Sequence, residues 1–140
     1  QRVQAIGVGG SSANLSGGCG LRGTIGATSP IVPGSPGFRI TLSNVPGALG
    51  GVLTMDTSPP LSPLINCGPC TVIPGFTTLF PPVFDTVAGT AHVPIPLPCV
   101  ASLIGGQFEF QWLILAIGPA PCSIVPNISA SDRMQIVIRE

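Results

Sequence analysis

Cys67-Gly68-Pro69-Cys70 is the segment of this chain whose residue types and spacing come closest to catalytic chemistry. A Cys-x-x-Cys pair acts as a thiol redox centre when its first cysteine begins a helix, because the helix N-terminus stabilises the thiolate. The next residues, Thr71-Val72-Ile73-Pro74-Gly75, are β-branched and then interrupted by proline. Since no helix is expected there, we interpret Cys67 and Cys70 as loop cysteines, bridged to each other or each to a distant partner.

A metal site would need ligands beyond this pair. Cys67 and Cys70 could supply half of a tetrahedral zinc site, but the other soft ligands show no second paired spacing. These other ligands are Cys99, Cys122 and His92. We therefore predict no metal ion and no cofactor.

Acid–base and nucleophilic catalysis are not indicated either. His92 is the only histidine, and the alternation of Thr90–Ile95 places it on the outward face of a strand, without a Ser or Cys nucleophile beside it. The acidic residues are too dispersed along the chain to indicate a carboxylate pair; they include Asp56, Asp85, Glu109 and Asp132. Gly7-Val8-Gly9-Gly10 lacks the βαβ context of a dinucleotide-binding motif. We predict that the chain is not an enzyme.

Two triplets fit the N-glycosylation sequon. They are Asn14-Leu15-Ser16 and Asn127-Ile128-Ser129, and both lie in settings typical of loops. We predict Asn14 and Asn127 as acceptor sites in a host that glycosylates.

The elements that position these residues belong to a chain with unusual composition. Glycine accounts for 19 of the 140 residues and proline for 17, while only 7% are charged and 44% are apolar. Glycine and proline at this level usually indicate disorder, but the apolar content is enough to form a core. The net charge is zero and the five arginines are scattered, which excludes a nucleic-acid footprint. So low a charge favours association, and we expect copies of the same chain as partners.

Cysteine usage indicates an oxidising compartment. The five cysteines are spread along the chain, so one must stay free or form an intermolecular bridge; the disulfide candidates are Cys19, Cys67, Cys70, Cys99 and Cys122. No segment reaches the length of a membrane span, and no signal peptide precedes Gln1. We predict a mature secreted protein, extracellular or at the cell surface, without membrane insertion.

Alternation of apolar and polar residues predicts short strands separated by turns. The clearest is Phe38–Ser43, which ends at the turn Asn44-Val45-Pro46-Gly47. Prolines make Thr90–Ile95 an edge strand or the fraying end of one, whereas Phe108–Leu115 becomes apolar on both faces, as a central strand does. Further strands are expected at Leu21–Ala27, Leu49–Asp56, Cys70–Ile73, Phe76–Phe80, Val83–Val87 and Arg133–Ile138, and one helical turn at Val100–Ile104.

This pattern predicts an all-β fold, an antiparallel jelly-roll or Ig-like β-sandwich of about eight strands. The sandwich is assigned to residues 19–140. Residues 1–18 are expected to form an extended N-terminal arm with a flexible Gly/Ser hinge. The strand-forming part of the arm consists of Arg2, Val3, Gln4, Ala5, Ile6, Gly7 and Val8.

From Cys19-Gly20 onward the chain resembles the small β-sandwich module at the C-terminal end of many secreted proteins of planctomycete-like bacteria. The residues that carry the resemblance are Cys19-Gly20, Phe38–Ala48, Asp85–Pro96, Phe108–Leu115 and the terminal strand. The resemblance implies an extracellular, non-enzymatic module, and it transfers no functional residues. The chain departs from the module in Cys70, Cys99 and Cys122 and in its N-terminal arm.

These observations favour a self-assembling structural protein, a subunit of a filament, sheath or surface layer. Its arm would complete a neighbour's sheet by strand addition, with disulfides as a further link. The alternative is a monomeric secreted adhesin or carbohydrate-binding sandwich, with Trp112 and phenylalanines as a sugar platform. A thiol oxidoreductase acting through Cys67 and Cys70 is the third hypothesis.

Overall fold

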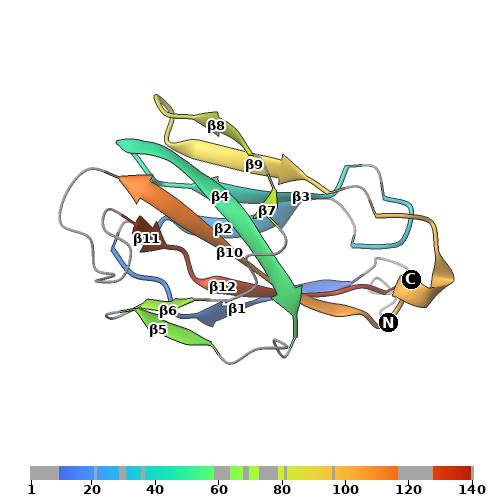
Figure 1. The fold of residues 1–140 in the computed structure, drawn as a ribbon. Helices are drawn as coiled ribbons and strands as arrows, with labels where there is room; N and C mark the ends of the chain where they lie inside the picture. Colours follow the sequence, from blue (N-terminus) through green and yellow to red (C-terminus); the bar gives the residue numbers. More distant parts are fainter. Residues whose placement is uncertain are drawn as a thin grey trace, which may run out of the picture.

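The protein is an antiparallel β-sandwich, as predicted (Figure 1). The computed structural model describes residues 10–20, 22–28, 31–35, 37–58, 64–67, 70–72, 79–80, 82–95, 97–116 and 128–139. Within these residues two antiparallel sheets, of six and four strands, pack face to face, and a two-stranded hairpin lies apart from them. The two main sheets therefore hold slightly more strands than the sequence predicts.

The larger sheet, sheet A, is built around the long strand β10 (Gln107–Ala116). β10 pairs on one side with β4 (Ala48–Thr57) and on the other with β12 (Arg133–Val137) and β11 (Ile128–Ala130). The sheet ends at β1 (Ser11–Ser16), beyond β12, and at β7 (Leu79–Phe80), beyond β4. The sequence-based prediction of a central strand at Phe108–Leu115 is confirmed.

The smaller sheet, sheet B, has the order β2–β3–β9–β8. Its strands are β2 (Thr24–Thr28), β3 (Arg39–Ser43), β9 (Thr90–Pro94) and β8 (Val83–Asp85). The prediction that Thr90–Ile95 is an edge strand is wrong, because β9 pairs with both β3 and β8. Pro94 is tolerated there because it is the last residue of the strand, where a missing N–H costs little pairing.

The core lies between the two sheets and follows the strand alternation. Phe110, Trp112 and Ile114 of β10 face Ile40 and Leu42 of β3, and all five are buried. The indole Nε1 of Trp112 donates to the Thr41 carbonyl at 3.1 Å, which joins sheet A to sheet B. A buried indole needs such a partner.

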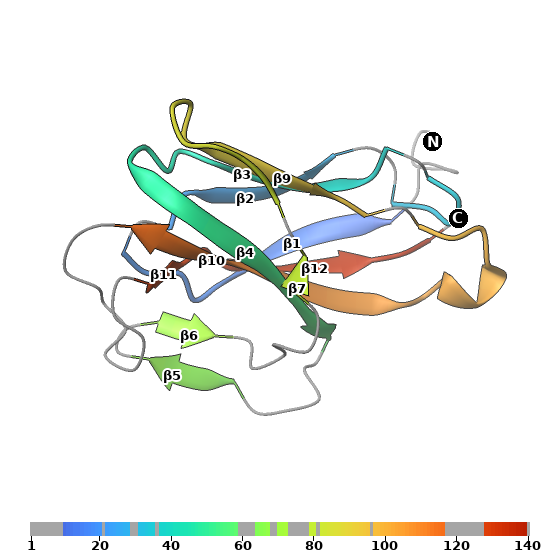
Figure 2. The ribbon, with the colours of Figure 1, turned by 45° about the horizontal axis from the view of Figure 1, so that its top comes forward.

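Two short elements complete the fold. The predicted helical turn is confirmed as the 3-10 helix η2 (Ala101–Leu103). The hairpin of β5 (Ile65–Cys67) and β6 (Cys70–Val72) lies against the outer face of sheet A, on the side away from sheet B (Figure 2). An isolated hairpin is marginally stable, so other contacts must hold it.

One part of the predicted hinge is instead regular structure. Ser11–Ser16 forms β1, hydrogen-bonded to β12 from Ser11 opposite Val137 to Ser16 opposite Arg133. Composition predicts flexibility for this Ser-rich segment, but the unpaired edge of β12 supplies backbone partners that a local sequence reading does not include.

Candidate assembly site

Strand β1 is a polar edge held almost entirely by its backbone. Five of its six residues are exposed and none is charged or proline. Natural edge strands are usually guarded by charge, proline, short length or a bulge. The one guard on β1 is the register shift between Asn14 and Ser16, which disrupts pairing along the free side of its C-terminal half.

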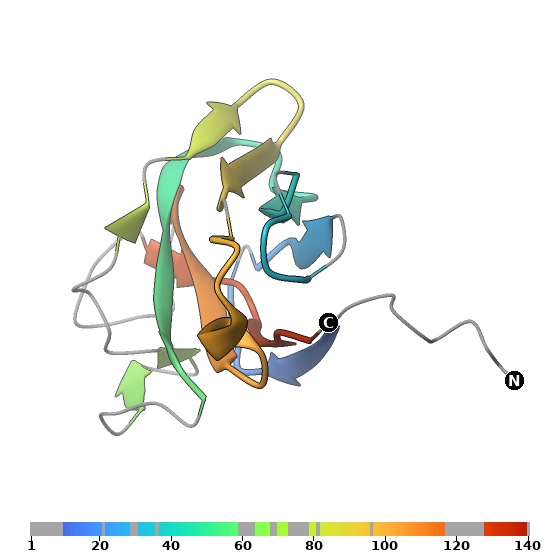
Figure 3. The same cartoon turned by 90° about the vertical axis from the view of Figure 1, so that its right-hand side faces the viewer.

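Strand β2, the edge of sheet B, has neither a charged residue nor a proline nor a register shift to guard it. Its five residues are Thr24–Thr28, and among the described strands it pairs only with β3. On the opposite edges, β7 has two residues, and β8 has three, begins after Pro82 and ends at Asp85. Figure 3 shows β1 and β2, the two blue strands, on the side of the sandwich away from β7 and β8. The sandwich therefore has one open side and one protected side.

The predicted assembly arm, Arg2–Val8, lies outside the described residues. The described chain begins at Gly10, whose N–H donates to the Ile31 carbonyl at 3.1 Å. A Cβ at this position would collide with the Val137 carbonyl, so the close approach requires glycine. The Arg139 N–H also donates to Ile31, at 3.3 Å, which places the start of the described chain beside its C-terminal end.

The base of β1 is fixed by a group that we call the Asp132 clasp, formed by Asp132, Asn14 and Gly18. The Oδ1 of Asp132 accepts from the Gly18 N–H at 2.8 Å, and its Oδ2 accepts from the Asn14 amide at 3.2 Å. The exposed Arg22 guanidinium lies 4.0 Å from the same carboxylate. Asp132 lies directly before β12, and the local sequence carries no signal of its long-range contacts with Asn14 and Gly18.

The cysteines confirm the disulfide prediction in part and place the Cys-x-x-Cys pair in a hairpin. Cys19 and Cys70 form a disulfide with a Cα–Cα distance of 5.2 Å. Cys70 is thus bonded to Cys19 and not to Cys67, which faces it across the β5–β6 pair. The side chain of Cys67 and all of Cys122 lie outside the described residues. Such an arrangement is a structural staple and is compatible with an oxidising compartment.

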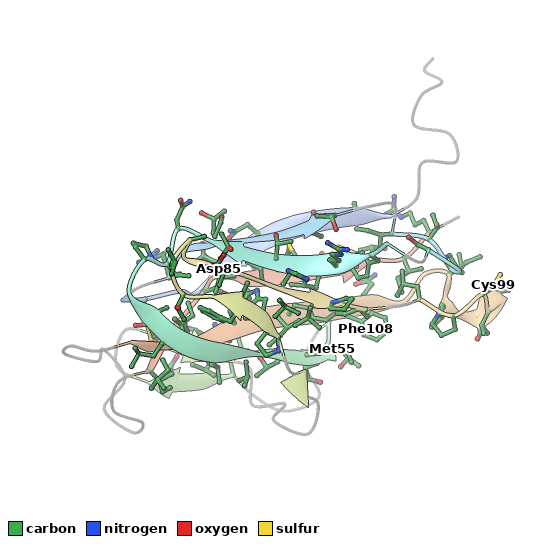
Figure 4. The ribbon with its side chains drawn as sticks, turned by 90° about the horizontal axis from the view of Figure 1, so that it is seen from above. Met55, Asp85, Cys99 and Phe108 are labelled. Atoms are coloured by element: carbon green, nitrogen blue, oxygen red, sulfur yellow. A yellow bond between two sulfur atoms is a disulfide. The ribbon has the colours of Figure 1, made fainter. Side chains whose placement is uncertain are left out.

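Cys99 has an exposed, free thiol. It lies next to η2, at one end of the sandwich (Figure 4). Gly10 and Arg139, the first and last described residues, lie toward the same end, because both bind Ile31 while the nearby Gly34 contacts Cys99 and the Leu97 carbonyl. An intermolecular bridge through Cys99 would therefore form close to where the arm departs.

The hairpin covers a polar network on the outer face of sheet A. The Gln111 amide donates to the Thr71 carbonyl on β6 and to the Ser131 carbonyl, both at 2.9 Å. The Thr71 N–H in turn donates to the Gly17 carbonyl at 3.0 Å. Buried amides require partners of this kind, and here they connect the hairpin to both β10 and the base of β1.

The structure brings together two carboxylates that the sequence leaves apart. Glu109 on β10 lies directly opposite Asp56 on β4, and therefore on the same sheet face. Glu109 is 3% exposed and accepts from Arg133 at 3.0 Å and from the Ser58 hydroxyl at 3.1 Å. Because its two oxygens already bind Arg133 and Ser58, the arrangement is that of a structural ion pair. The sequence does not show the register of β4 against β10, and therefore does not indicate that Asp56 and Glu109 are neighbours.

The other predicted residues are not gathered into a site. His92 lies outward on β9, between buried Ala91 and Val93, as predicted. Asp85 has a turn role. Its Oδ1 accepts from the backbone N–H groups of Val87 and Ala88, which forms an Asx-type turn between β8 and β9. In the described part of the chain, no three His, Cys, Asp or Glu side chains are grouped to hold a metal ion.

Of the two sequons, only Asn14 can be placed, because Asn127 lies outside the described residues. Asn14 is exposed on β1, not in a loop. Its amide belongs to the Asp132 clasp and its Oδ1 accepts from the Ser16 N–H at 2.7 Å. A glycan at Asn14 would be attached to the same nitrogen that donates to Asp132.

Trp112 is not a ligand platform. Its side chain is 0% exposed and packs in the core between the sheets. Phe38 and Phe110 are also buried there, and Phe84 and Phe108 pack against the same core. These five aromatic residues therefore serve packing, as their strand positions predict.

Two negative findings complete the description. Among the residues that the structure describes, no helix has the length and apolar character needed to cross a membrane. No family model, curated protein or solved structure matches this chain. Its function is therefore inferred from the geometry of its own edges.

Proposed function

We propose that this chain is an extracellular structural protein that assembles with copies of itself into a filament, sheath or surface layer by strand addition. The observation that carries the proposal is the open side of the sandwich. Both sheets end there in strands, β1 and β2, that bear no charge and no proline. Such an edge offers unpaired N–H and C=O groups to another strand.

The arm supplies a strand of matching size. The five residues of β2 span about 17 Å, and Arg2–Val8 is long enough to pair with all of them. A contact in which the arm of one chain meets the edge of the next is heterologous, and unless its rotation closes a ring it produces an open filament. Zero net charge and 7% charged residues remove long-range repulsion between copies.

Secretion and covalent linkage belong to the same proposal. The Cys19–Cys70 disulfide favours an oxidising, extracellular setting, as does the resemblance to secreted bacterial modules. The free thiol of Cys99 would allow an intermolecular disulfide once chains are assembled. The buried Trp112 leaves the carbohydrate-binding alternative without its proposed platform.

The proposal is tested by removing the arm while keeping β1. Deletion of residues 1–9 leaves every strand of the sandwich intact, whereas deletion through Gly18 would also strip β1 from β12. Electron microscopy and light scattering should show assemblies for the full chain and monomers for the deletion. Assemblies of unchanged size without the arm would overturn the mechanism, and monomers of the full chain at all concentrations would overturn the function.

A point variant tests the edge itself. Lysine on an edge strand opposes pairing with another strand, so Thr28→Lys on β2 should shift assembly to higher protein concentration. Thr90→Lys is the matched control, because Thr90 is equally exposed but lies on the internal strand β9. An equal effect of the two substitutions would show that β2 is not the accepting edge.

A further inference from the structure

We infer that strand addition occurs by exchange: β1 leaves its own β12 and pairs with the β12 of a neighbouring chain, taking the arm with it. This inference rests on the proposed function and names the segment that moves. The described part of the donated unit is β1, Ser11–Ser16, and its last residue, Ser16, is the hinge. The partner is a second copy of this chain.

The first support is how little side-chain packing holds β1. Only Leu15 is even half-buried, and the other five residues are exposed. The Asn14 side chain of β1 donates to Asp132 at 3.2 Å, and this bond lies at the exposed base of the strand. A strand held by its backbone ladder loses few core contacts when it leaves, and a neighbour's β1 restores every one of them.

The second support is a change in the contacts of the chain at Ser16. Before Ser16 the strand is mostly exposed, and after it each of the next three residues makes hydrogen bonds or a disulfide to the body of the sandwich. Immediately beyond Ser16, the Gly17 carbonyl binds the Thr71 N–H, and the Gly18 N–H binds Asp132. Cys19 then forms a two-way backbone bridge with Ala130 and the disulfide with Cys70. Movement of β1 therefore stops at this point, and the sandwich behind it stays intact.

The third support is the conformation of the hinge. Ser16 has φ of 63° and Gly17 has φ of 99°. The left-handed region is unfavourable for serine, whereas glycine adopts it freely. A short, strained hinge is the feature that promotes exchange between copies, because an extended hinge between two chains relieves the strain.

Exchange of β1 also fits this edge of sheet A better than the addition of a further strand outside β1. The bulge between Asn14 and Ser16 interrupts the free side of β1 and disfavours a further strand there. β12, by contrast, is regular over the paired stretch from Met134 to Val137. Exchange alone makes no contact that the closed chain lacks. In the closed chain, β1 is tethered beside its own β12 at an effective concentration in the millimolar range. The free energy gained from pairing of the arm and from relaxation of the hinge must therefore exceed this advantage of the closed chain.

A cross-link between positions 11 and 137 distinguishes the closed from the exchanged state. Ser11 and Val137 are directly opposite each other, so the double variant Ser11→Cys and Val137→Cys, in a Cys99→Ser background, can form a disulfide across β1 and β12. Isotopically heavy and light chains are mixed before assembly, oxidised afterwards and digested for mass spectrometry. Exchange predicts heavy–light peptide pairs as abundant as like pairs.

The outcomes separate this inference from the proposed function. Assemblies that contain only like pairs would overturn exchange and leave addition by the arm alone. Monomers that contain only like pairs would overturn both. Heavy–light pairs confined to the assembled fraction would support both.

A matched pair of serine variants tests the hinge. Ser16→Gly removes the left-handed penalty from the closed chain and should lower the exchanged fraction about 5–30-fold. Ser12→Gly weakens β1 equally in both states, because Ser12 pairs with Ile136 in either chain, and should leave that fraction unchanged. Equal behaviour of the two variants, or more exchange in Ser16→Gly, would overturn the role of the hinge.

Discussion

Replacing both cysteines of the Cys19–Cys70 disulfide by alanine is expected to lower the free energy of unfolding by about 4 kcal/mol. The bridge spans a sequence separation of 51 residues. The loop-closure relation gives about 14 cal/mol/K for a loop of that size, which is about 4 kcal/mol at 25 °C. Alanine suits the site because both cysteines are buried in a small apolar cluster with Val72 and Ala130. The loss is a large share of the stability of a typical domain.

The same substitution should loosen the hairpin before the rest of the sandwich. Without the bridge, β5 and β6 are held by the small apolar cluster and by the bonds that Thr71 makes to Gln111 and Gly17. Hydrogen exchange at the Thr71 N–H should therefore accelerate more than exchange at core amides such as that of Ile114.

Urea unfolding followed by the fluorescence of the single Trp112 measures the global effect. Cys99→Ser is the control, since Cys99 is exposed and unbonded, and it should change stability by less than about 0.5 kcal/mol. A loss below about 1 kcal/mol in the double alanine variant, with the bridge verified in the parent protein, would refute the loop-closure reasoning.

Two further sets of substitutions and one quenching measurement test the polar network and the core. Gln111→Ala removes two hydrogen bonds of a buried amide and should cost about 1–3 kcal/mol in urea unfolding; Gln107→Ala, exposed on the same strand, should cost little. Arg133→Met strands the buried Glu109 carboxylate and should cost about 3–5 kcal/mol, most of which a second substitution, Glu109→Leu, should restore; failure of the double variant to recover would show that the pair does more than neutralise charge. Acrylamide should quench Trp112 fluorescence far less in the folded protein than in urea, because the side chain is fully buried; efficient quenching when folded would contradict the core assignment and revive a ligand platform.

Alternation in the sequence was sufficient to predict most strands. β3, β10 and β12 lie within one or two residues of their expected bounds, because each has one face in the core and side chains alternate with a period of two. Proline was a weaker guide. Pro94 suggests an edge, but a proline at the last residue of β9 leaves the rest of its ladder intact.

Pairing between distant segments could not be predicted. The Ser-rich composition of β1 indicates a hinge, and only the free edge of β12 makes it a strand. Asp56 and Glu109 are far apart in the sequence, and only the register of β4 against β10 makes them neighbours. Likewise, Cys67-Gly68-Pro69-Cys70 suggests a redox pair by spacing, while the bridge of Cys70 to Cys19 is long-range.

The sequence by itself therefore determined that this chain is a β-sandwich with few charged residues and zero net charge, because strand alternation, turn residues and charge are local or additive properties. The tertiary structure decided which strands became edges, which cysteine Cys70 bonds, and where the chain changes from loosely to firmly held. Those features depend on contacts between residues far apart in the chain. Their free energies exist only once the sheets are formed, which is why the hinge at Ser16 and the clasp at Asp132 leave no mark in the local sequence.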